Sequence, residues 1–554
     1  MSELTWNGHV GTVRAGVALT VLTALAYFSV LGGELTFDDR AMVVENEIVT
    51  EAQWWALLTT SYWSGITGQE GGLYRPLTMV NLAAQHALFG DHSSGYRLVS
   101  IVLHAVTGLA LFLVVRRLLA SPRALTAAAL FCLHPINSEV VSTSVGNAES
   151  LALLLSLLAL YFLFTDRTWF REMEAASLLV LAQLAKESAA VVAIAVALAG
   201  AYARNRRLAV MGLTATAVGL GFRLAITERL GPGPIGFLDN PLSHLPPFER
   251  IGAGLTVGVL YLTKFVVPWP LVADYSFDQI RAPERLGDAH VVAAVTFLLS
   301  LIAIALRTAR RRPAVLISVL AAAGSLAIAS NLIIVIGTVF AERLLYLYSA
   351  AACAIAVATL PRRQPRWWII GSGLGLVFGL LCAQRAADWR SDGQLFEAAV
   401  RDSPRSARSH FGLGLARHRA GDLEAAIASY QRAVAIFPRY TDAWFNMGAA
   451  HLAGEQLIPA RDSYLRAAAA RPGYRKALLA AALIGERIAP TDDRTVADYK
   501  RVLQVDAGDV TAVSRLADLY IRRGEPDLAI GVLRHALMKG ENSKLRRRLQ
   551  RLSP

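Results

Sequence analysis

The sequence predicts an all-α protein in which a polytopic membrane domain, residues 1–384, precedes a helical-repeat solenoid, residues 385–554. Three observations lead to this prediction. First, 54% of the 554 residues are apolar. Second, long apolar segments alternate with short basic groups through the first two thirds of the chain. Third, the last third of the chain repeats with a step of 34 residues.

The composition favours a membrane protein over a soluble one. The mean hydropathy is +0.42, and soluble domains carry a smaller share of apolar residues. The formal net charge of +13 does not indicate a nucleic-acid partner, because the basic residues cluster between apolar segments rather than along one soluble face. The three cysteines lie inside apolar stretches without a CxxC pair, so we expect neither a disulfide framework nor a metal site.

The basic residues also predict which loops are cytoplasmic. The first apolar segment, Val10–Leu31, is too long for a signal peptide and is expected to remain as a membrane helix. Further apolar segments follow at about 97–115, 124–136, 148–164, 175–203, 208–226, 289–306, 313–334, 345–360 and 366–383. The basic groups that should face the cytoplasm are Arg116, Arg117 and Arg123; Arg167 and Arg171; Arg204, Arg206 and Arg207; Arg307 with Arg310 to Arg312; and Arg362, Arg363 and Arg366.

One topology puts all these groups on the same side of the membrane. It requires the segment 175–203 to cross twice, turning near Lys186 and Glu187, and the segment 250–268 not to cross fully. About 11 membrane helices result, with a cytoplasmic N-terminus and external loops at about 32–96 and 227–288. A single crossing by 175–203 stays open as an alternative, although it would place a lysine and a glutamate near the middle of the membrane.

The C-terminal part of the chain is built from repeats. Pro404, Pro438 and Pro472 recur at intervals of 34 residues, and Asp506 and Gly540 continue the same step. Each unit has two amphipathic helices separated by a Gly-Asp turn, which is the pattern of tetratricopeptide repeats, and about four repeats are present. Such stacks leave a concave surface for an extended peptide or a partner helix. A rigid structural cap without a ligand is the alternative.

Two adjacent carboxylates, Asp38 and Asp39, follow the first apolar segment in "LTFDDRAMVVENEIV". Adjacent side chains usually diverge, so one of them can face a cavity as a general base while the other orients the local structure. Either residue could instead cap a helix N-terminus. The sequence does not decide which of the two is the base.

Polar residues in other external segments are candidates for substrate binding. Arg75 lies in "GGLYRPLTMVNL", where it could instead pair with an acidic neighbour. Glu139 and Glu149 lie in "LHPINSEVVSTSVGNAES", which is unusually polar for a link between two membrane helices. A carboxylate there can bind sugar hydroxyls, whereas a role in the first turn of a helix is the simpler alternative for Glu149.

Fixed cations at the membrane boundary are candidates for binding a phosphate group. Arg343 lies in "GTVFAERLLYLYSAA", close to Tyr346, and Lys186 lies in "LAKES". An arginine at this depth could also extend its side chain to the membrane interface without binding a ligand.

Taken in chain order, "FDDR", "YRPLT", "SGYRLVSIVLHAVTGLALF", "ALFCLHPINSEVVSTSVGNAESLALL", "LAKES", "AERLLYLYS" and the repeats resemble one enzyme family. It is the transmembrane and tetratricopeptide-repeat O-mannosyltransferase family of the GT-C glycosyltransferases. The resemblance implies an inverting, metal-independent transfer of a hexose, mannose above all, from a polyprenyl-phosphate carrier to a hydroxyl group. It also implies that Asp38, with Asp39 as second choice, is the base and that Arg343, Lys186 and Tyr346 bind the carrier phosphate.

The resemblance makes a serine or threonine of a protein, presented by the repeats, the expected acceptor. The few repeats and the composition rich in Ala, Leu and Arg resemble a bacterial member. We therefore expect an inner-membrane protein with its active site and repeats in the periplasm, surrounded by lipids and without a cofactor beyond the lipid-linked sugar. The alternatives are a non-enzymatic scaffold that recruits proteins through the repeats and a transferase with a lipid or glycan acceptor.

Overall fold

The computed structural model describes residues 9–66, 72–165, 168–231, 233–280, 313–360 and 367–552, together with isolated positions between 292 and 307. Every regular element in these ranges is a helix, which confirms the predicted all-α class. The chain forms two compact units, residues 1–403 and 404–554, which we call the membrane unit and the repeat unit. Residues 385–403, which the sequence analysis grouped with the repeats, pack with the membrane unit.

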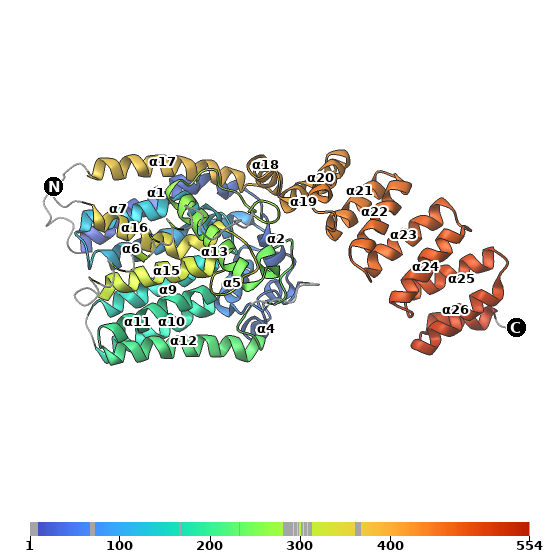
Figure 1. Ribbon diagram of the computed structural model, residues 1–554, viewed down its shortest axis with the longest axis horizontal. Helices are drawn as coiled ribbons and strands as arrows, with labels where there is room; N and C mark the ends of the chain where they lie inside the picture. The colour runs from blue at the N-terminus through green and yellow to red at the C-terminus, as the bar shows by residue number, and fades with distance from the viewer. Residues whose placement is uncertain are drawn as a thin grey trace. The chain divides into compact units, whose positions relative to one another are not determined.

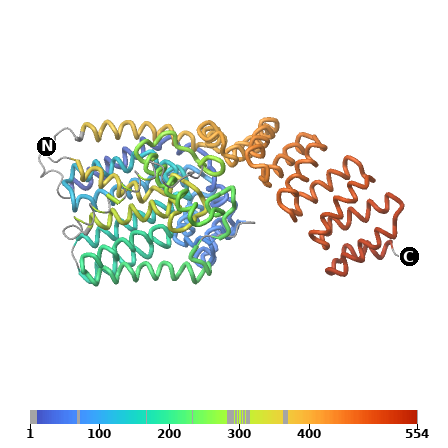
Figure 2. Tube along the Cα trace, in the orientation of Figure 1, coloured from blue at the N-terminus to red at the C-terminus, as the bar shows by residue number. Residues whose placement is uncertain are grey.

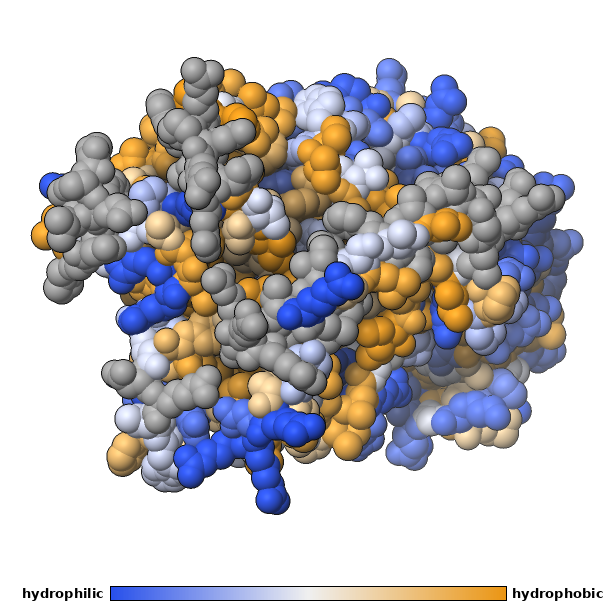
Figure 3. Space-filling model, turned by 60° about the vertical axis from the view of Figure 1, so that its left-hand side comes forward, coloured by the Kyte–Doolittle hydropathy of each residue, from blue (hydrophilic) through white to orange (hydrophobic). Residues whose placement is uncertain are grey.

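Long apolar helices form the body of the membrane unit, where they lie side by side (Figure 1). Many of them have one buried face and one exposed apolar face; on α1, for example, Ala15 and Leu19 are buried while Val13 and Val17 are exposed. Apolar side chains consequently cover broad areas of the surface (Figure 3). The helices are α1 (His9–Tyr27), α6 (Ser93–Val115), α7 (Ser121–Leu133), α9 (Asn147–Leu163), α10 (Trp169–Ala185), α11 (Ala190–Tyr202), α12 (Arg206–Thr227), α13 (Pro247–Val266), α15 (Pro313–Ala329), α16 (Tyr346–Thr359) and α17 (Trp367–Asp388).

Within the described residues, four helical segments are long and apolar enough to cross a membrane: Val10–Gly32, Ser93–Val115, Arg206–Thr227 and Ile369–Asp388. A pair of helices bent by 52°, Ser121–Leu133 with Pro135–Val141, makes a fifth. These segments identify an integral membrane protein. The number of about 11 crossings stays a prediction, and the predicted span 289–306 lies almost wholly outside the described residues.

The segment 175–203 contains two helices rather than one. Helix α10 ends at Ala185, and a 3-10 turn, η4 (Glu187–Ala189), separates it from α11. Both helices pack against α12: the side chain of Gln183 in α10 donates a hydrogen bond to the carbonyl of Ala215 at 2.9 Å, and Gly212 lies against Ala193 and Ala197 of α11. The turn predicted near Lys186 and Glu187 is therefore present.

Short helices occupy the external loop predicted at about 32–96 and gather at one end of the membrane unit (Figure 1). Other short elements follow between the long helices, and three of the short helices supply residues of the candidate site described below. The short helices are η2 (Phe28–Gly32), α2 (Asp38–Val43), α3 (Glu47–Thr50), α4 (Trp54–Thr59), α5 (Pro76–Phe89), η3 (Pro135–Asn137), α8 (Ser138–Val141), η5 (Pro241–His244) and η6 (Glu342–Leu345). The predicted loop 227–288 contains η5 and the 20-residue helix α13.

The membrane unit ends with α18 (Asp392–Asp402), and the repeat unit continues with four helix pairs and a last helix (Figure 2). This arrangement confirms the predicted number of repeats. Consecutive helices pack through equivalent contacts, because Gly414 lies against the ring of Tyr430 and Gly448 against that of Tyr464. The pairs are α19 (Ala407–Arg419) with α20 (Leu423–Ile436), α21 (Thr441–Ala453) with α22 (Leu457–Ala470), α23 (Arg475–Ile488) with α24 (Asp493–Val505) and α25 (Val510–Arg522) with α26 (Pro526–Lys539), and the last helix is α27 (Ser543–Leu552).

Gly414→Ala should destabilise the repeat unit by about 1–3 kcal/mol, because the added methyl group would lie 2.6 Å from the ring of the buried Tyr430. Gly531→Ala is the matched control. Gly531 is an exposed position inside α26 with no atom within 4 Å of an added Cβ, so alanine should stabilise the helix by about 0.5–1 kcal/mol. Thermal unfolding of the full-length variants measures both changes, and equal effects of the two substitutions would contradict this packing.

Candidate functional site

Asp39 anchors the loop that carries both adjacent carboxylates. Its side chain is fully buried and pairs with the equally buried Arg97 of α6 at 2.9 Å. The carboxylate also accepts hydrogen bonds from the backbone N–H groups of Ser144 and Val145, at 2.8 to 2.9 Å. Every side of this carboxylate is thus engaged by the protein, which favours a structural role over catalysis for Asp39.

Arg97 joins three segments at this point. Besides Asp39, its guanidinium donates to the carbonyls of Glu34, at 2.5 Å, and of Ser142, and to the hydroxyl of Thr36 at 3.1 Å. The loop before α2 and the turn between α8 and α9 are therefore both fastened to α6. Sequence reasoning did not select Arg97, although an arginine within an apolar span is itself an indication of an important polar contact.

Asp38 is only half-buried, and it lies within electrostatic range of Arg343 of η6. Burial alone would lower the pKa of Arg343, but the negative charges of Glu139, Asp38 and Glu149 outweigh this effect and raise it. Three segments that are far apart in the sequence, at Asp38, at Glu139 to Glu149 and at Arg343, thus lie within electrostatic range of one another. Asp38 and Asp39 diverge as expected, because one approaches Arg343 and the other is held by Arg97.

Arg343 and Glu139 form a close ion pair. The guanidinium of Arg343 donates to Oε1 of Glu139, and the backbone N–H of Arg343 donates to Oε2 at 3.0 Å. The side chain of Arg343 remains 28% exposed, whereas that of Glu139 is 3% exposed. The arginine is therefore accessible to a ligand, while the buried glutamate holds the arginine side chain in place.

Two further ion pairs lie at the turn between α10 and α11. Lys186 is paired with Glu149 of α9, and both side chains are 6% exposed. Next to it, Glu187 accepts two hydrogen bonds from Arg75, at 2.8 and 2.6 Å. Burial would raise the pKa of Glu187, but Arg75 and then Lys186 hold it near 2. Arg75 thus has an acidic partner, its role in substrate binding stays a prediction, and the site holds alternating positive and negative groups.

Tyr62 lies among these charges, although sequence reasoning did not select it. The guanidinium of Arg75 lies 4.9 Å from the centre of its ring. Burial raises the pKa of Tyr62, and its titration is also affected by Arg75, Asp38 and Arg343. The buried hydroxyl has no hydrogen-bond partner among the described residues. A ligand that enters the site could supply one.

Tyr346 is placed apart from the predicted phosphate-binding cations. It begins α16, but its hydroxyl points into the helix bundle, where it lies 2.6 Å from Nδ1 of His104 and accepts a hydrogen bond from Ser150 at 3.3 Å. The side chain is 1% exposed. These contacts leave the hydroxyl no room for a phosphate group, so the predicted role of Tyr346 is not favoured by its packing.

Glu342, the neighbour of Arg343, fixes η6 in place. Its carboxylate accepts hydrogen bonds from the backbone N–H of Val272, at 2.5 Å, and from the hydroxyl of Tyr275, at 2.9 Å. Burial raises the pKa of Glu342 to about 7, although the positive charge of Arg385 opposes the shift. The loop after α13 and the turn that carries Arg343 are thereby joined.

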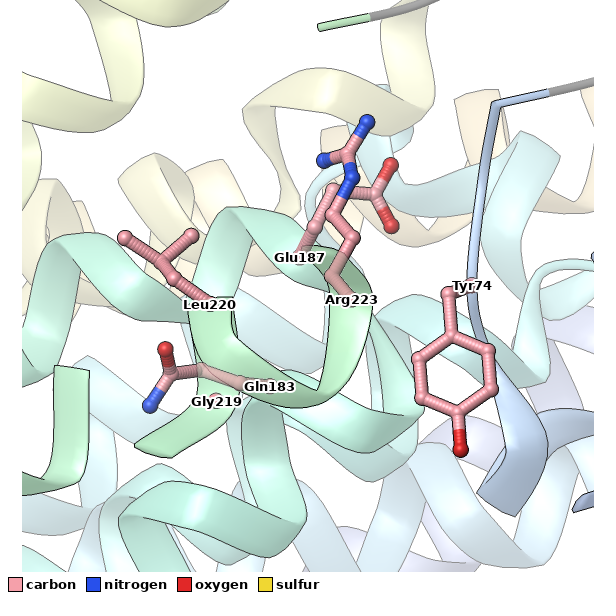
Figure 4. A pocket seen from close by; sticks show the side chains of 6 residues that line it. All are labelled: Tyr74, Gln183, Glu187, Gly219, Leu220 and Arg223. Carbon is pink, nitrogen blue, oxygen red and sulfur yellow. The ribbon is translucent and has the colours of Figure 1, made fainter. Parts of the chain in front are cut away.

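A small pocket opens beside the pair formed by Arg75 and Glu187 (Figure 4). It lies between α10, α12 and the segment before α5, and Arg223 at its edge donates hydrogen bonds to the carbonyls of Gly72 and Gly231. The residues that line the pocket are Tyr74, Gln183, Glu187, Gly219, Leu220 and Arg223. Among the described residues no group of three or more His, Cys, Asp or Glu side chains could hold a metal ion.

Comparison with known proteins finds sequences that are similar to this chain. A family model described as dolichyl-phosphate-mannose-protein mannosyltransferase matches residues 76–227, and models of the tetratricopeptide repeat match residues 393–441 and 512–545. A protein O-mannosyl-transferase from Caenorhabditis elegans is 24% identical over 420 residues, which are 74% of this chain and 60% of that protein. Protein O-mannosyl-transferase TMTC4 from Mus musculus is 26% identical over 492 residues, which are 74% of this chain and 65% of the mouse protein.

The chain is related to the transmembrane and tetratricopeptide-repeat O-mannosyltransferases. The resemblance drawn from the sequence is thereby confirmed, and the match to the mannosyltransferase model lies within the membrane unit. The chain spans about three fifths of the length of the curated relatives it matches. Among solved structures, the crystal structure of MamA matches with 22% identity and a TM-score of 0.23, over 26% of this chain and 88% of that chain.

Removal of either partner of the buried ion pair should destabilise the membrane unit strongly. Asp39→Asn or Arg97→Met leaves one buried charge without its partner, which costs about 3–5 kcal/mol. The pair formed by Arg40 and Glu45 is the control, because both side chains are about half exposed and such pairs contribute little. Thermal unfolding of purified variants measures the effect. The double variant should lose less than the sum of the single losses, and strictly additive losses would contradict the coupling.

Proposed function

We propose that this protein is an inverting glycosyltransferase that moves mannose from a polyprenyl-phosphate carrier to a serine or threonine hydroxyl of a protein outside the cytoplasm. The proposal rests on one observation. The acid Asp38 and the paired cations Arg343 and Lys186 come together at one place of the membrane unit. The description of the matching family model and the names of the relatives support the sugar, the carrier and the protein acceptor.

Asp38 is the proposed general base. It is half-buried on the first turn of α2, and unlike Asp39 it lies toward Arg343. Asp38 takes the proton of the acceptor hydroxyl while the hydroxyl oxygen forms a bond to C1 of the sugar. The bond between C1 and the carrier phosphate breaks at the same time, and its electron pair leaves with the phosphate. Attack from the face opposite to the leaving group inverts the configuration at C1.

Arg343 and Lys186 are proposed to stabilise the departing phosphate. Without the donor, their charges are balanced by Glu139 and Glu149. A lipid phosphate that enters the site offers both cations a second anionic partner, and fixed cations stabilise the negative charge that grows on the leaving group. Glu139 and Glu149, which pair with these cations, and Arg75, which pairs with Glu187, are the proposed contacts for sugar hydroxyls.

The location and the protein partner follow from the same proposal. In this proposal the donor's lipid chain lies in the bilayer beside the long apolar helices, and the repeats offer a surface of the kind that binds extended peptides. A bacterial inner membrane with the site and the repeats in the periplasm is the location that fits the composition. The donor would then be carried by a bacterial polyprenyl phosphate.

Asp38→Asn should reduce transfer about 10²- to 10⁴-fold, because the amide cannot accept the acceptor proton. Arg343→Ala should reduce it about 10²-fold or more through loss of charge stabilisation at the leaving phosphate. Arg40→Ala, which changes an exposed arginine two residues from Asp38, should leave the rate unchanged. The assay uses purified protein in lipid nanodiscs, polyprenyl-phosphate mannose and a peptide rich in serine and threonine.

The assay also separates the alternatives. Wild-type rates for both Asp38→Asn and Arg343→Ala would refute the proposed mechanism. Complete absence of turnover in the wild-type protein with every donor would favour the scaffold. Transfer to a lipid or glycan acceptor, but to no peptide, would retain the roles of the donor site and refute the protein acceptor.

A further inference from the structure

Phe37, the residue directly before Asp38, has an unusual backbone conformation. Its φ is 56° and its ψ is −124°. A bulky residue rarely adopts positive φ, and such a conformation persists only where the surrounding structure imposes it. The contacts of Phe37 therefore determine the direction in which the chain enters α2 and presents Asp38.

The contacts that impose this conformation come from residues 389–396, at the other end of the membrane unit's sequence. The backbone N–H of Phe37 donates a hydrogen bond to the carboxylate of Asp392 in α18 at 2.9 Å. The ring of Phe37 packs against Trp389 and Phe396, with ring centres 6.4 and 6.1 Å apart. Both the amide and the side chain of Phe37 are thus held by the same short segment.

The residues just before Phe37 are held by this segment as well. The N–H of Glu34 donates to the carbonyl of Arg390 at 2.7 Å. At Gly33 a side chain would collide with the backbone, because an added Cβ would lie 2.8 Å from Cα of Arg390. Residues 33–37 are therefore fastened to residues 389–396 by backbone contacts that depend on close approach.

The carboxylate of Asp392 is not needed as the cap of its own helix. The hydroxyl of Ser391 performs that role by accepting a hydrogen bond from the N–H of Gln394. The side chain of Asp392 is instead turned toward the loop that precedes α2. A charged acceptor gives the stronger kind of hydrogen bond to a backbone N–H.

We propose that Asp392 is a positioning residue for the transferase reaction: by holding the N–H of Phe37, it keeps the turn in which Asp38 approaches Arg343 while Asp39 faces Arg97. The inference rests on the proposed function, in which Asp38 is the base. Without the carboxylate, Phe37 can relax toward negative φ, and the direction of Asp38 changes while the anchor at Asp39 remains. Residues 389–396 thus act as part of the transferase.

The test compares three full-length variants. Asp392→Ala should lower kcat about 10- to 100-fold and leave KM for polyprenyl-phosphate mannose unchanged, because the base is displaced while the phosphate-binding cations are not. Asp392→Asn should restore most of the rate, since its side-chain oxygen still accepts the hydrogen bond. Gln394→Ala, at an exposed position of the same helix, should behave as wild type.

Hydrogen exchange gives a readout that does not depend on activity. Peptides that contain Phe37 should exchange faster in Asp392→Ala than in Asp392→Asn or in the wild-type protein. Unchanged kcat and unchanged exchange in Asp392→Ala would overturn the inference, and so would an equal loss of rate in Asp392→Asn. If Asp38→Asn retains the wild-type rate, the proposed function fails; if only Asp392→Ala does, the positioning role alone fails.

Discussion

The buried ion pair between Arg97 and Asp39 is the interaction on which the candidate site depends. Both side chains are fully withdrawn from solvent, and the guanidinium fastens the loop before α2 and the turn before α9 to one long helix. A buried pair of this kind adds little net stability compared with an apolar substitute, but it tolerates only one geometry. That geometry leaves Asp39 without capacity for chemistry and lets Asp38 approach Arg343.

The remaining charges of the site are arranged as mutually balanced pairs. Arg343 with Glu139, Lys186 with Glu149, and Arg75 with Glu187 each join two segments that are distant in the sequence. In a poorly solvated environment an unpaired charge is costly, so the proposed site for an anionic lipid head group requires acidic partners for its cations before the ligand binds. The same partners keep the cations in place for a ligand.

Sequence patterns revealed most residues of the site but not the role of each residue. "FDDR" indicates a base, yet the choice between its two carboxylates depends on Arg97, nearly sixty residues later. Tyr346 shares a segment with Arg343, but the helical turn that begins at Tyr346 directs its hydroxyl to His104 and Ser150 instead. Residues 389–396 carry no motif at all, and their role appears only because Asp392 meets the N–H of Phe37.

The sequence alone determined the all-α class, the membrane location and the 34-residue repeat, because each of these follows from periodicity or composition within a single stretch of chain. The turn near Lys186 was one of two interpretations that the sequence left open, and the break between α10 and α11 decided it. Tertiary structure alone decided which charges are partners, which carboxylate is anchored and where the membrane unit ends. Ion pairs and hydrogen bonds between distant segments depend on the directions of side chains in the folded bundle, and no local pattern records those directions.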